Sequence, residues 1–396
     1  MLTMFLILNH HRKQLEIVDR DREIALARTA VLGFEEYKEI VAFEILVRLP
    51  PKAILRCRAV CRDWRRIASA RNFLVAHHRR QPSLRLAEAY KQGDHFCHKI
   101  LAIDHRAAQL QPVLQLSGDY VKASSDGSGI LVKASCDGLL VLCIDQISIC
   151  NPATRQFVGL NLHGFNVRAL YLHRPTGDYR LLLCSIPDAQ TAINQDLCYV
   201  LTLGCDQLPR CIGRPASRMW FTPVLVRGNL HWTWRYEQHQ NRNEMVMTVF
   251  DTTLESFRQM RAPMVDNAFL FEMDDMLGMY SYSEHMTIVN IWVMEDYGRD
   301  VWSHMHKVKL PEAEIRGHLD GLESWGVIVT YEAGDLLVLV DVGTRVLHVD
   351  TEGKSLSSSD YHGHFLIPEL VKLKQSLVPH VFFSRLQGAV NVWPFI

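Results

Sequence analysis

Between residues 40 and 68 the hydrophobic positions recur with the period of an α-helix. Val41, Ile45 and Leu49 are four residues apart, which predicts a helix that ends at the proline pair that follows. The second proline of that pair suits the first turn of another helix. The apolar positions of the next segment share one helical face, and they are Val60, Cys61, Trp64, Ile67 and Ala68. The pattern predicts a compact unit of three helices.

From about residue 95 the pattern changes to short strands separated by turns. Strand-like runs include Leu139–Leu142, Met247–Phe250 and Leu336–Val340. Turn signals such as Asp137-Gly138 and Gly334-Asp335 separate them. No long helical pattern alternates with the strands, which disfavours a parallel sheet covered by helices.

Three of these segments form a weak repeat. Each begins with a turn and an apolar run, and the three starts are Asp137, Asn229 and Asp335, which lie 92 and 106 residues apart. These distances are about twice the ~40–50 residues of a propeller blade. The strand that follows each start ends in Asn or Asp, at Asn151, Asp251 and Asp350. Such a side chain can hydrogen-bond the backbone two residues on and close a turn.

These patterns predict an α+β multidomain chain. We expect a variable leader over residues 1–39, a small N-terminal helical module over residues 40–86, and an all-β, propeller-like domain over residues 95–396. The apolar start, Met1 to Leu8, lacks a basic segment before it and a small-residue cleavage site after it, which favours a helix start over a signal peptide.

Charge adds a local asymmetry to this picture. The 396 residues hold 43 Lys+Arg and 43 Asp+Glu, so the formal net charge is zero, which excludes a wholly basic nucleic-acid binder. Residues 40–86 nevertheless contain eleven Lys/Arg and two Asp/Glu, a local charge of +9. The run Arg71, His77-His78, Arg79, Arg80 and Arg85 could contact phosphates, but no aromatic ladder accompanies it. A solvated face or a surface for an acidic partner is favoured.

The ten cysteines lie mostly in apolar runs and include no Cys-x-x-Cys, so we expect reduced core thiols and a cytoplasmic or nuclear location. No apolar stretch of 18 residues occurs, so no membrane span is expected. The sequence contains no catalytic motif of a metalloprotease or a serine hydrolase, and it contains no phosphate-binding loop. The fragments His95-Phe-Cys97-His98, His304-Met-His306 and His362-Gly-His364 each lack a second ligand pair nearby. We therefore expect no enzyme, no cofactor and no metal.

The helical segment resembles an F-box, the module that docks substrate receptors on cullin-RING ubiquitin ligases. The resemblance rests on Leu49-Pro-Pro-Lys52 and on Val60-Cys-Arg-x-Trp64-Arg65. One departure is that Tyr37-Lys38-Glu39 stands where the family usually has Leu-Pro followed by acidic residues. The later part is similar to the F-box-associated domain of large plant F-box families. The runs that carry this similarity begin at Cys136, Ile149, Pro223, Val249 and Val289.

The resemblance implies a substrate-recognition subunit that docks on a Skp-type adaptor and presents a target protein for ubiquitination. We expect adaptor contacts, or packing within the module itself, from Ile45, Leu46, Leu49, Pro50, Leu55, Val60, Cys61 and Trp64. Target contacts are expected from Trp232, Trp234, Arg235 and Tyr236, although a plain hairpin loop is the simpler interpretation of that segment. Two alternatives stay open: a ligase-independent β-scaffold with a degenerate F-box, and a propeller hydrolase.

Overall fold

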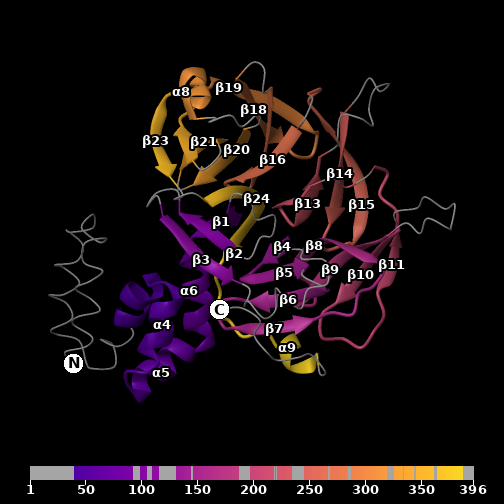
Figure 1. Ribbon diagram of the computed structural model, residues 1–396. Coiled ribbons are helices and arrows are strands. Elements are labelled where there is room, and N and C mark those ends of the chain that lie inside the picture. Colours follow the sequence, from indigo (N-terminus) through magenta and orange to yellow (C-terminus); the bar gives the residue numbers. More distant parts are fainter. Residues whose placement is uncertain are drawn as a thin grey trace. The chain divides into compact units, whose positions relative to one another are not determined.

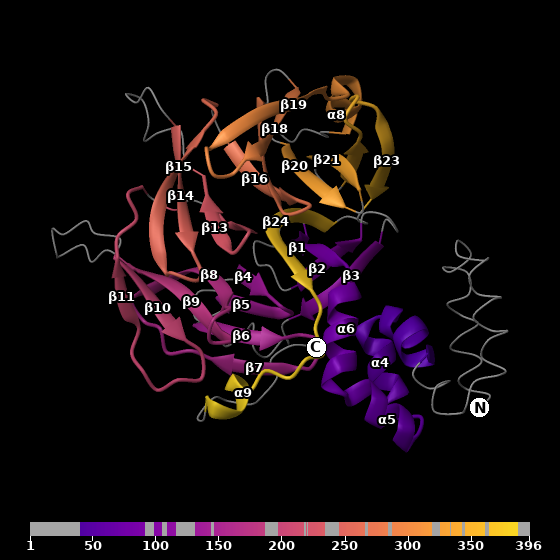
Figure 2. The ribbon, with the colours of Figure 1, turned by 180° about the vertical axis from the view of Figure 1, so that it is seen from behind.

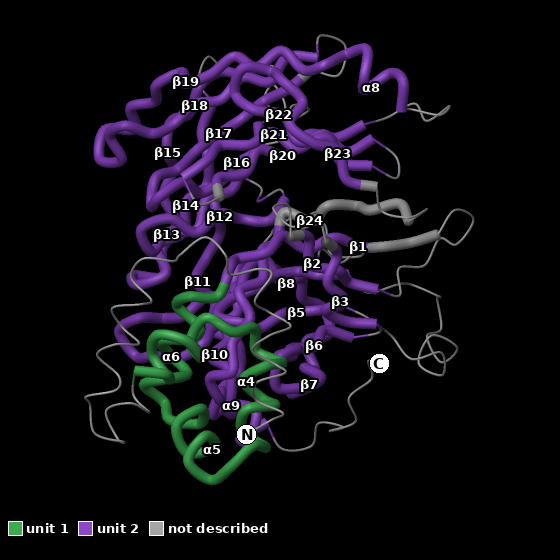
Figure 3. Tube along the Cα trace, turned by 90° about the vertical axis from the view of Figure 1, so that its left-hand side faces the viewer, with its two compact units in different colours: residues 1–81 green, residues 82–396 purple. Residues whose placement is uncertain are grey.

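The computed structural model describes residues 40–91, 99–104, 109–115, 131–143, 146–186, 197–217, 219, 221–233, 245–265, 268–283, 287–318, 325–332, 334–342, 345–360 and 364–386. The leader predicted for residues 1–39 lies outside this set. The chain divides into two compact units, residues 1–81 and 82–396 (Figure 3).

The first unit is helical. Its elements are the π-helical turn η2 (Val41–Ile45), the 3₁₀ turn η3 (Leu46–Arg48), α4 (Pro51–Cys57), α5 (Arg62–Ser69) and α6 (Arg71–Arg80). As predicted, α4 begins at the second proline of the pair. The apolar face predicted for α5 is shorter than expected, because Val60 and Cys61 precede the helix and Cys61 is its N-cap, with Sγ 3.5 Å from the Trp64 backbone nitrogen.

The first predicted helix is the element of this unit that differs most from the prediction. The Leu46 backbone nitrogen bonds the carbonyl of Val41, five residues back, as in a π-helix. The buried residues are accordingly Val41, Ala42, Leu46 and Val47, a spacing of five, and Ile45 is turned to the surface. The sequence pattern placed Val41 and Ile45 on one apolar face, whereas the wider turn separates the exposed Ile45 from the buried Val41.

The second unit is a six-bladed β-propeller built from six four-stranded antiparallel sheets (Figures 1 and 2). The repeat predicted a propeller but not the number of its blades. Blade 1 contains β1 (Ser83–Lys91), β2 (Lys99–Asp104), β3 (Gln109–Gln115) and β24 (His364–Lys374). Blade 2 contains β4 (Leu131–Cys136), β5 (Leu139–Cys143), β6 (Ile147–Asn151) and β7 (Gln156–Gly159). Blade 3 contains β8 (Phe165–His173), β9 (Asp178–Ser185), β10 (Cys198–Thr202) and β11 (Arg210–Gly213). Blade 4 contains β12 (Val224–Val226), β13 (Asn229–Trp232), β14 (Met245–Asp251) and β15 (Ser256–Ala262). Blade 5 contains β16 (Ala268–Met273), β17 (Met276–Ser283), β18 (Ile288–Asp296) and β19 (Val301–Lys309). Blade 6 contains β20 (Gly326–Glu332), β21 (Asp335–Val342), β22 (Arg345–Val349) and β23 (Ser355–Asp360).

The two ends of the propeller sequence close the ring. In blade 1 the late strand β24 pairs antiparallel with the early strand β1, and Figure 1 shows the two side by side. This pairing gives β1 a partner on both sides and completes the four strands of blade 1. The edges that remain in a propeller are short and protected. β1 begins at Ser83, before the predicted domain start at 95 and within the range 40–86 given to the helical module. The sequence signal of β1 is one short alternation, which the helical pattern before it obscured.

Turns closed by Asn or Asp recur in four blades. The side-chain oxygens of Asn151, Asp251 and Asp350 each accept from two backbone N–H groups of the turn that follows, at 2.7–3.3 Å. These turns belong to blades 2, 4 and 6, so the predicted repeat spans two blades. Asp296 closes the corresponding turn of blade 5 by bonds from Gly298 and Arg299.

Tyrosine hydroxyl groups tie neighbouring blades together. Tyr179 of blade 3 donates to Asp137 of blade 2 at 3.0 Å, and Tyr280 of blade 5 donates to the Val327 carbonyl of blade 6 at 3.1 Å. Tyr331 of blade 6 donates to Asp274 of blade 5 at 2.6 Å. These bonds satisfy polar groups at the blade contacts, while the apolar clusters between the sheets supply most of the burial.

The segment after β24 runs beside blades 2 and 3 and ends in the short helix α9 (Phe382–Arg385) (Figure 2). The buried Asn151 amide donates to the Ser376 carbonyl at 3.1 Å. Gly138 has φ +86, and a Cβ there would lie 2.4 Å from Ser376 Cβ. Glycine is therefore required at this turn both by the left-handed backbone and by the close approach of the segment.

Among the nine cysteines that the structure describes, Cys150, Cys184 and Cys198 are buried, as the core-thiol prediction expects, and all nine are free thiols. Cys61, Cys205 and Cys211 are exposed instead. The segments that carry these three are a helix cap, a turn and an edge strand, whose surfaces remain open to solvent.

Candidate functional site

The helical unit exposes a group of apolar side chains that a monomeric module would normally bury. Ile45, Leu55 and Val60 are 43%, 39% and 50% exposed, and Pro50 and Cys61 are also exposed. Five of the eight residues predicted to contact an adaptor thus offer surface. An exposed group of this kind on a unit of this size is typical of an interaction site.

The other three predicted contact residues lie deeper. Leu46 is 3% exposed and packs in the core, so its side chain offers no surface to a partner. Leu49 and Trp64 are half-buried, which lets each combine internal packing with an exposed edge. Leu46 is inward because its backbone N–H bonds the carbonyls of both Val41 and Ala42, which places it on their buried side.

Two side chains near the C-terminal end of the helical unit contact the backbone carbonyl of Leu49, just before the exposed Pro50. His77 Nε2 lies 2.8 Å from the Leu49 carbonyl oxygen, and Gln81 Nε2 donates to the same oxygen at 3.2 Å. Burial lowers the pKa of His77, against the opposing effect of its bond to Leu49, so the ring is neutral near pH 7. The helix α6 was not among the predicted helices, although Phe73, Leu74 and His77 have helical spacing and are buried there.

The arginines of this unit divide into two groups. Arg58 donates from Nε and Nη2 to the Ala68 carbonyl at 3.1 and 2.9 Å, and Arg65 donates to the Arg58 carbonyl at 3.1 Å, so both hold α4 to α5. Arg56, Arg62 and Arg66 are exposed. The segment that carries the exposed Leu55, Val60 and Cys61 therefore also carries exposed positive charge, which suits an acidic partner.

Of the residues predicted to contact a target, Trp232 lies inside the propeller. It is 1% exposed and packs with Tyr171, Phe250 and Met219 between blades 3 and 4. This corrects its expected role, because a buried indole offers no surface to a target. Trp234, Arg235 and Tyr236 lie outside the described residues. Nothing local in the sequence separates an inward from an outward tryptophan at the end of a strand.

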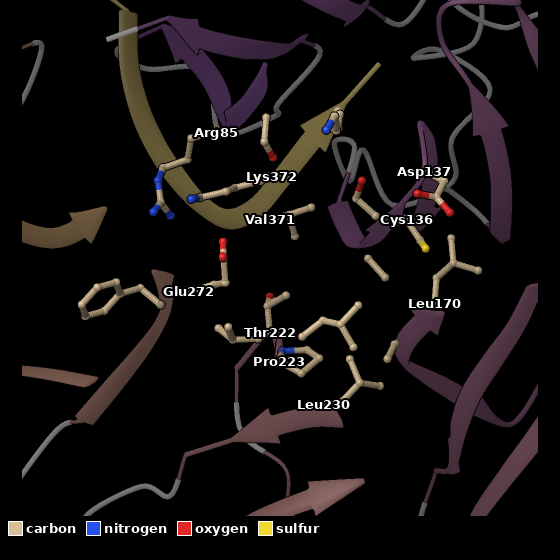
Figure 4. Close-up of a pocket in the computed structure, with 18 residues that line it drawn as sticks. Arg85, Cys136, Asp137, Leu170, Thr222, Pro223, Leu230, Glu272, Val371 and Lys372 are labelled. Atoms are coloured by element: carbon tan, nitrogen blue, oxygen red, sulfur yellow. The ribbon is translucent and has the colours of Figure 1, made fainter. Parts of the chain in front are cut away.

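A cavity of about 310 Å³ lies among the first strands of the blades (Figure 4). Its lining comes from β24, β4, β8, β12, β13 and β16, together with the start of β1 and the residues beside these strands. The charged residues that line it are Arg85, Lys372, Lys374, Asp137 and Glu272. Burial lowers the pKa of Lys374, and the nearby Asp137 opposes that shift. Arg85, predicted as part of a basic surface run, is instead 3% exposed and belongs to β1.

A buried histidine links blades 4 and 5. His231 is fully buried, with Nδ1 3.1 Å from the Val224 carbonyl oxygen and Nε2 2.7 Å from the Tyr297 hydroxyl. The carbonyl requires a proton on Nδ1, so Nε2 accepts from Tyr297 and the ring is neutral. Burial is the largest cause of the low pKa of His231, which is about 4, and the charge of Arg258 also lowers it. The bonds to Val224 and Asn229 act in the opposite direction and are outweighed.

We expect this histidine to make the propeller less stable in mild acid. The folded pKa lies below the unfolded value of 6.5, so the unfolded chain binds the proton more readily. The contribution of His231 is complete above pH 6.5 and is lost as the pH falls toward 4, by on the order of 2–3 kcal/mol since one pKa unit is about 1.4 kcal/mol. Urea unfolding midpoints between pH 4 and pH 7 should fall less steeply for His231→Gln than for the unsubstituted chain. His163→Gln, at an exposed site, should keep the full slope; equal slopes for all three proteins would contradict the prediction.

Among the described residues, no group of three or more His, Cys, Asp or Glu side chains has the arrangement of a metal site. His304 instead lies 3.4 Å from the Asn290 amide oxygen. The fragment at residues 95–98 lies wholly outside these residues, and so does His362 of the third fragment. In the same part of the chain, no helix is both long enough and apolar enough to cross a membrane.

Two sequence profiles match this chain. The family described as "F-box associated beta propeller domain" matches residues 101–377, more than half of the chain. The family described as "F-box-like" matches residues 40–80, the helical unit.

Individual proteins are similar over most of their length. An F-box protein of Arabidopsis thaliana is 23% identical over 329 residues, which cover 75% of this chain and 79% of that protein. A second F-box protein of Arabidopsis thaliana is 24% identical over 298 residues, 72% of this chain and 73% of that protein. A solved puromycin-hydrolyzing peptidase of Mycobacterium tuberculosis has a TM-score of 0.37 and 11% identity, covering 76% of this chain and 57% of the peptidase, a likeness too low to bear on activity.

Proposed function

This chain belongs to the F-box associated β-propeller family, and we propose that it is the substrate-recognition subunit of an SCF-type cullin-RING ubiquitin ligase. The F-box docks on a Skp-type adaptor, and the propeller binds a target protein. The role is non-enzymatic: the ligase's conjugating enzyme performs the chemistry, and this chain raises the effective concentration of target lysines near it. Such a role places the protein in the cytoplasm or the nucleus.

The observation that carries the proposal is the exposed apolar group on the helical unit. Ile45, Leu55 and Val60 are each at least 39% exposed, and the match to F-box-like sequences covers all three. The exposed arginines around them would attract an acidic partner and steer its approach. Leu49, Pro50, Cys61 and Trp64 extend the proposed contact, and Leu46 supports it from the core.

Charge placed at this surface tests the proposal. Val60→Asp and Ile45→Asp should each abolish co-purification with a Skp-type adaptor, because docking would desolvate an unpaired carboxylate at a cost of several kcal/mol. Both positions are exposed in the free protein, so circular dichroism and the thermal midpoint should stay as they are.

Leu254→Asp is the matched control, since Leu254 is 75% exposed on a propeller turn, and it should co-purify normally. Full adaptor binding by Val60→Asp and Ile45→Asp would exclude this surface as the docking site. If the unsubstituted chain does not bind the adaptor, the alternative of a ligase-independent scaffold with a degenerate F-box replaces the proposal.

A further inference from the structure

Two cations face each other across the strands that close the propeller ring. Arg85 of β1 and Lys372 of β24 are direct cross-strand partners, and both line the cavity of about 310 Å³ described above. Like charges directly opposite in an antiparallel pair are destabilising, more so where solvent is partly excluded. Arg85 is only 3% exposed, so bulk water does little to screen it.

The strand geometry at this point is irregular. Arg85 pairs with Lys372 but Ala87 pairs with Pro368, so β24 has extra residues between the two pairs. Pro368 has no N–H for the ladder, which is consistent with a bulge there. Bulges redirect side chains and are frequent next to functional sites. Here the bulge adjoins the pair of cations that lines the cavity.

The rest of the lining defines what could occupy the space. Three cations, Arg85, Lys372 and Lys374, face two carboxylates, Asp137 and Glu272, an excess of one positive charge. Figure 4 shows Arg85, Lys372 and Glu272 at one side of the cavity, with Val371, Pro223 and Leu230 between them and Asp137. A volume of about 310 Å³ is at the lower end of the ~300–1,000 Å³ of small-molecule sites.

We propose that this cavity binds a single oxyanion, a carboxylate or phosphate group, between Arg85 and Lys372. The planar guanidinium of Arg85 supplies paired donors for two oxygens, and the Lys372 ammonium supplies a point charge. The apolar wall of Val371, Pro223 and Leu230 contacts the body that carries the anion. Glu272 is exposed at the same side and weakens anion binding by repulsion. The proposal is independent of adaptor docking.

Thermal unfolding and titration calorimetry of the full chain test it, with inorganic phosphate and succinate as probes at an ionic strength held constant with sodium chloride. We expect a saturable rise in the thermal midpoint of the unsubstituted protein with both probes. Arg85→Gln should weaken binding at least about tenfold, the loss of one charge-assisted hydrogen bond. Glu272→Gln should bind both probes several-fold more tightly. Arg299→Gln, at an 84%-exposed guanidinium, should bind like the unsubstituted protein.

If Arg85→Gln fails to fold, Lys372→Gln takes its place, since this half-exposed lysine is easier to replace, and it should also weaken binding. The absence of saturable binding in the unsubstituted protein overturns the proposal, as does equal binding by Lys372→Gln and Glu272→Gln. In particular, anion binding seen only in Glu272→Gln would show that Glu272 itself fills the site as an internal counterion.

Two sources of the oxyanion are separated by a capped Gly-Glu-Gly peptide and its Gly-Gln-Gly counterpart. Binding of the glutamate peptide but not of its glutamine counterpart, in addition to phosphate and succinate, identifies an acidic side chain of a protein as the ligand. Binding of phosphate or succinate without either peptide identifies a free small anion.

Discussion

A chain that begins at Pro82 should fold and unfold cooperatively, whereas a chain that begins at Gly93 should lose its cooperative thermal transition. The eleven residues between these starts include the whole of β1, which pairs with β24 on one side and β2 on the other. Without β1 the last strand has no partner within its blade and the ring stays open. Fully burying a side chain such as Leu86 is worth about 2 kcal/mol, so the loss of this strand, with its buried Leu86 and Ala87, is large against a total stability of ~5–15 kcal/mol.

Circular dichroism and calorimetry of the two chains provide the measurement. The chain from Pro82 should give a β-dominated spectrum and one sharp transition. The chain from Gly93 should give a broad transition and should aggregate through its unpaired edges. A sharp transition at the same temperature in both chains would mean that β24 does not close the ring. The comparison also tests the domain start, which the sequence pattern placed at 95.

The parts of the fold that could be predicted are those with a local and repeated signal. A turn closed by Asn or Asp recurs at Asn151, Asp251 and Asp350, and the distances between repeats predicted two blades each, as the structure confirms. Asp296 has the same role in blade 5. It was not identified as part of the repeat because the turn before its strand pair, at Asp274-Asp275, has no glycine.

The parts that could not be predicted depend on small shifts of phase or on distant partners. The π-turn separates the exposed Ile45 from the buried Val41, and the four-residue spacing of these two residues does not show it. Trp232 is buried because blade 3 packs against it, which no local pattern indicates. The cavity brings Arg85 together with Glu272 and Lys372 from strands far apart in sequence.

We expect a carboxylate shared by two blades to be the polar group of the propeller whose replacement lowers the folding stability most. Glu255, in the turn between β14 and β15 of blade 4, accepts from Tyr171 at 2.7 Å and from Arg180 at 2.6 Å, and Arg210 also bonds it. All three donors belong to blade 3. The Glu255 side chain is 6% exposed and that of Arg180 is 15% exposed, so little solvent screens this pair.

The charge of Glu255 is favoured in the folded protein. Burial alone would raise its pKa, but the hydrogen bonds from Arg180 and Tyr171, with the charges of Arg180 and Arg210, outweigh burial and lower it. A folded pKa below the unfolded value of 4.5 means that the unfolded chain binds the proton more readily. This stabilisation is therefore complete above pH 4.5 and is lost as the pH falls through the lower, folded value.

Glu255→Gln should destabilise the propeller by about 3 kcal/mol at pH 7, because it leaves the largely buried Arg180 without its counterion. Urea unfolding should show a lower midpoint with an unchanged slope, since the surface exposed on unfolding stays the same. Glu352→Gln removes an exposed carboxylate from the related turn of blade 6 and should cost less than about 0.5 kcal/mol. Below pH 4 the gap between Glu255→Gln and the unsubstituted chain should narrow, because protonation removes the same charge. A gap that is constant from pH 7 to pH 3 would assign the loss to the shape of the turn and not to the ion pair.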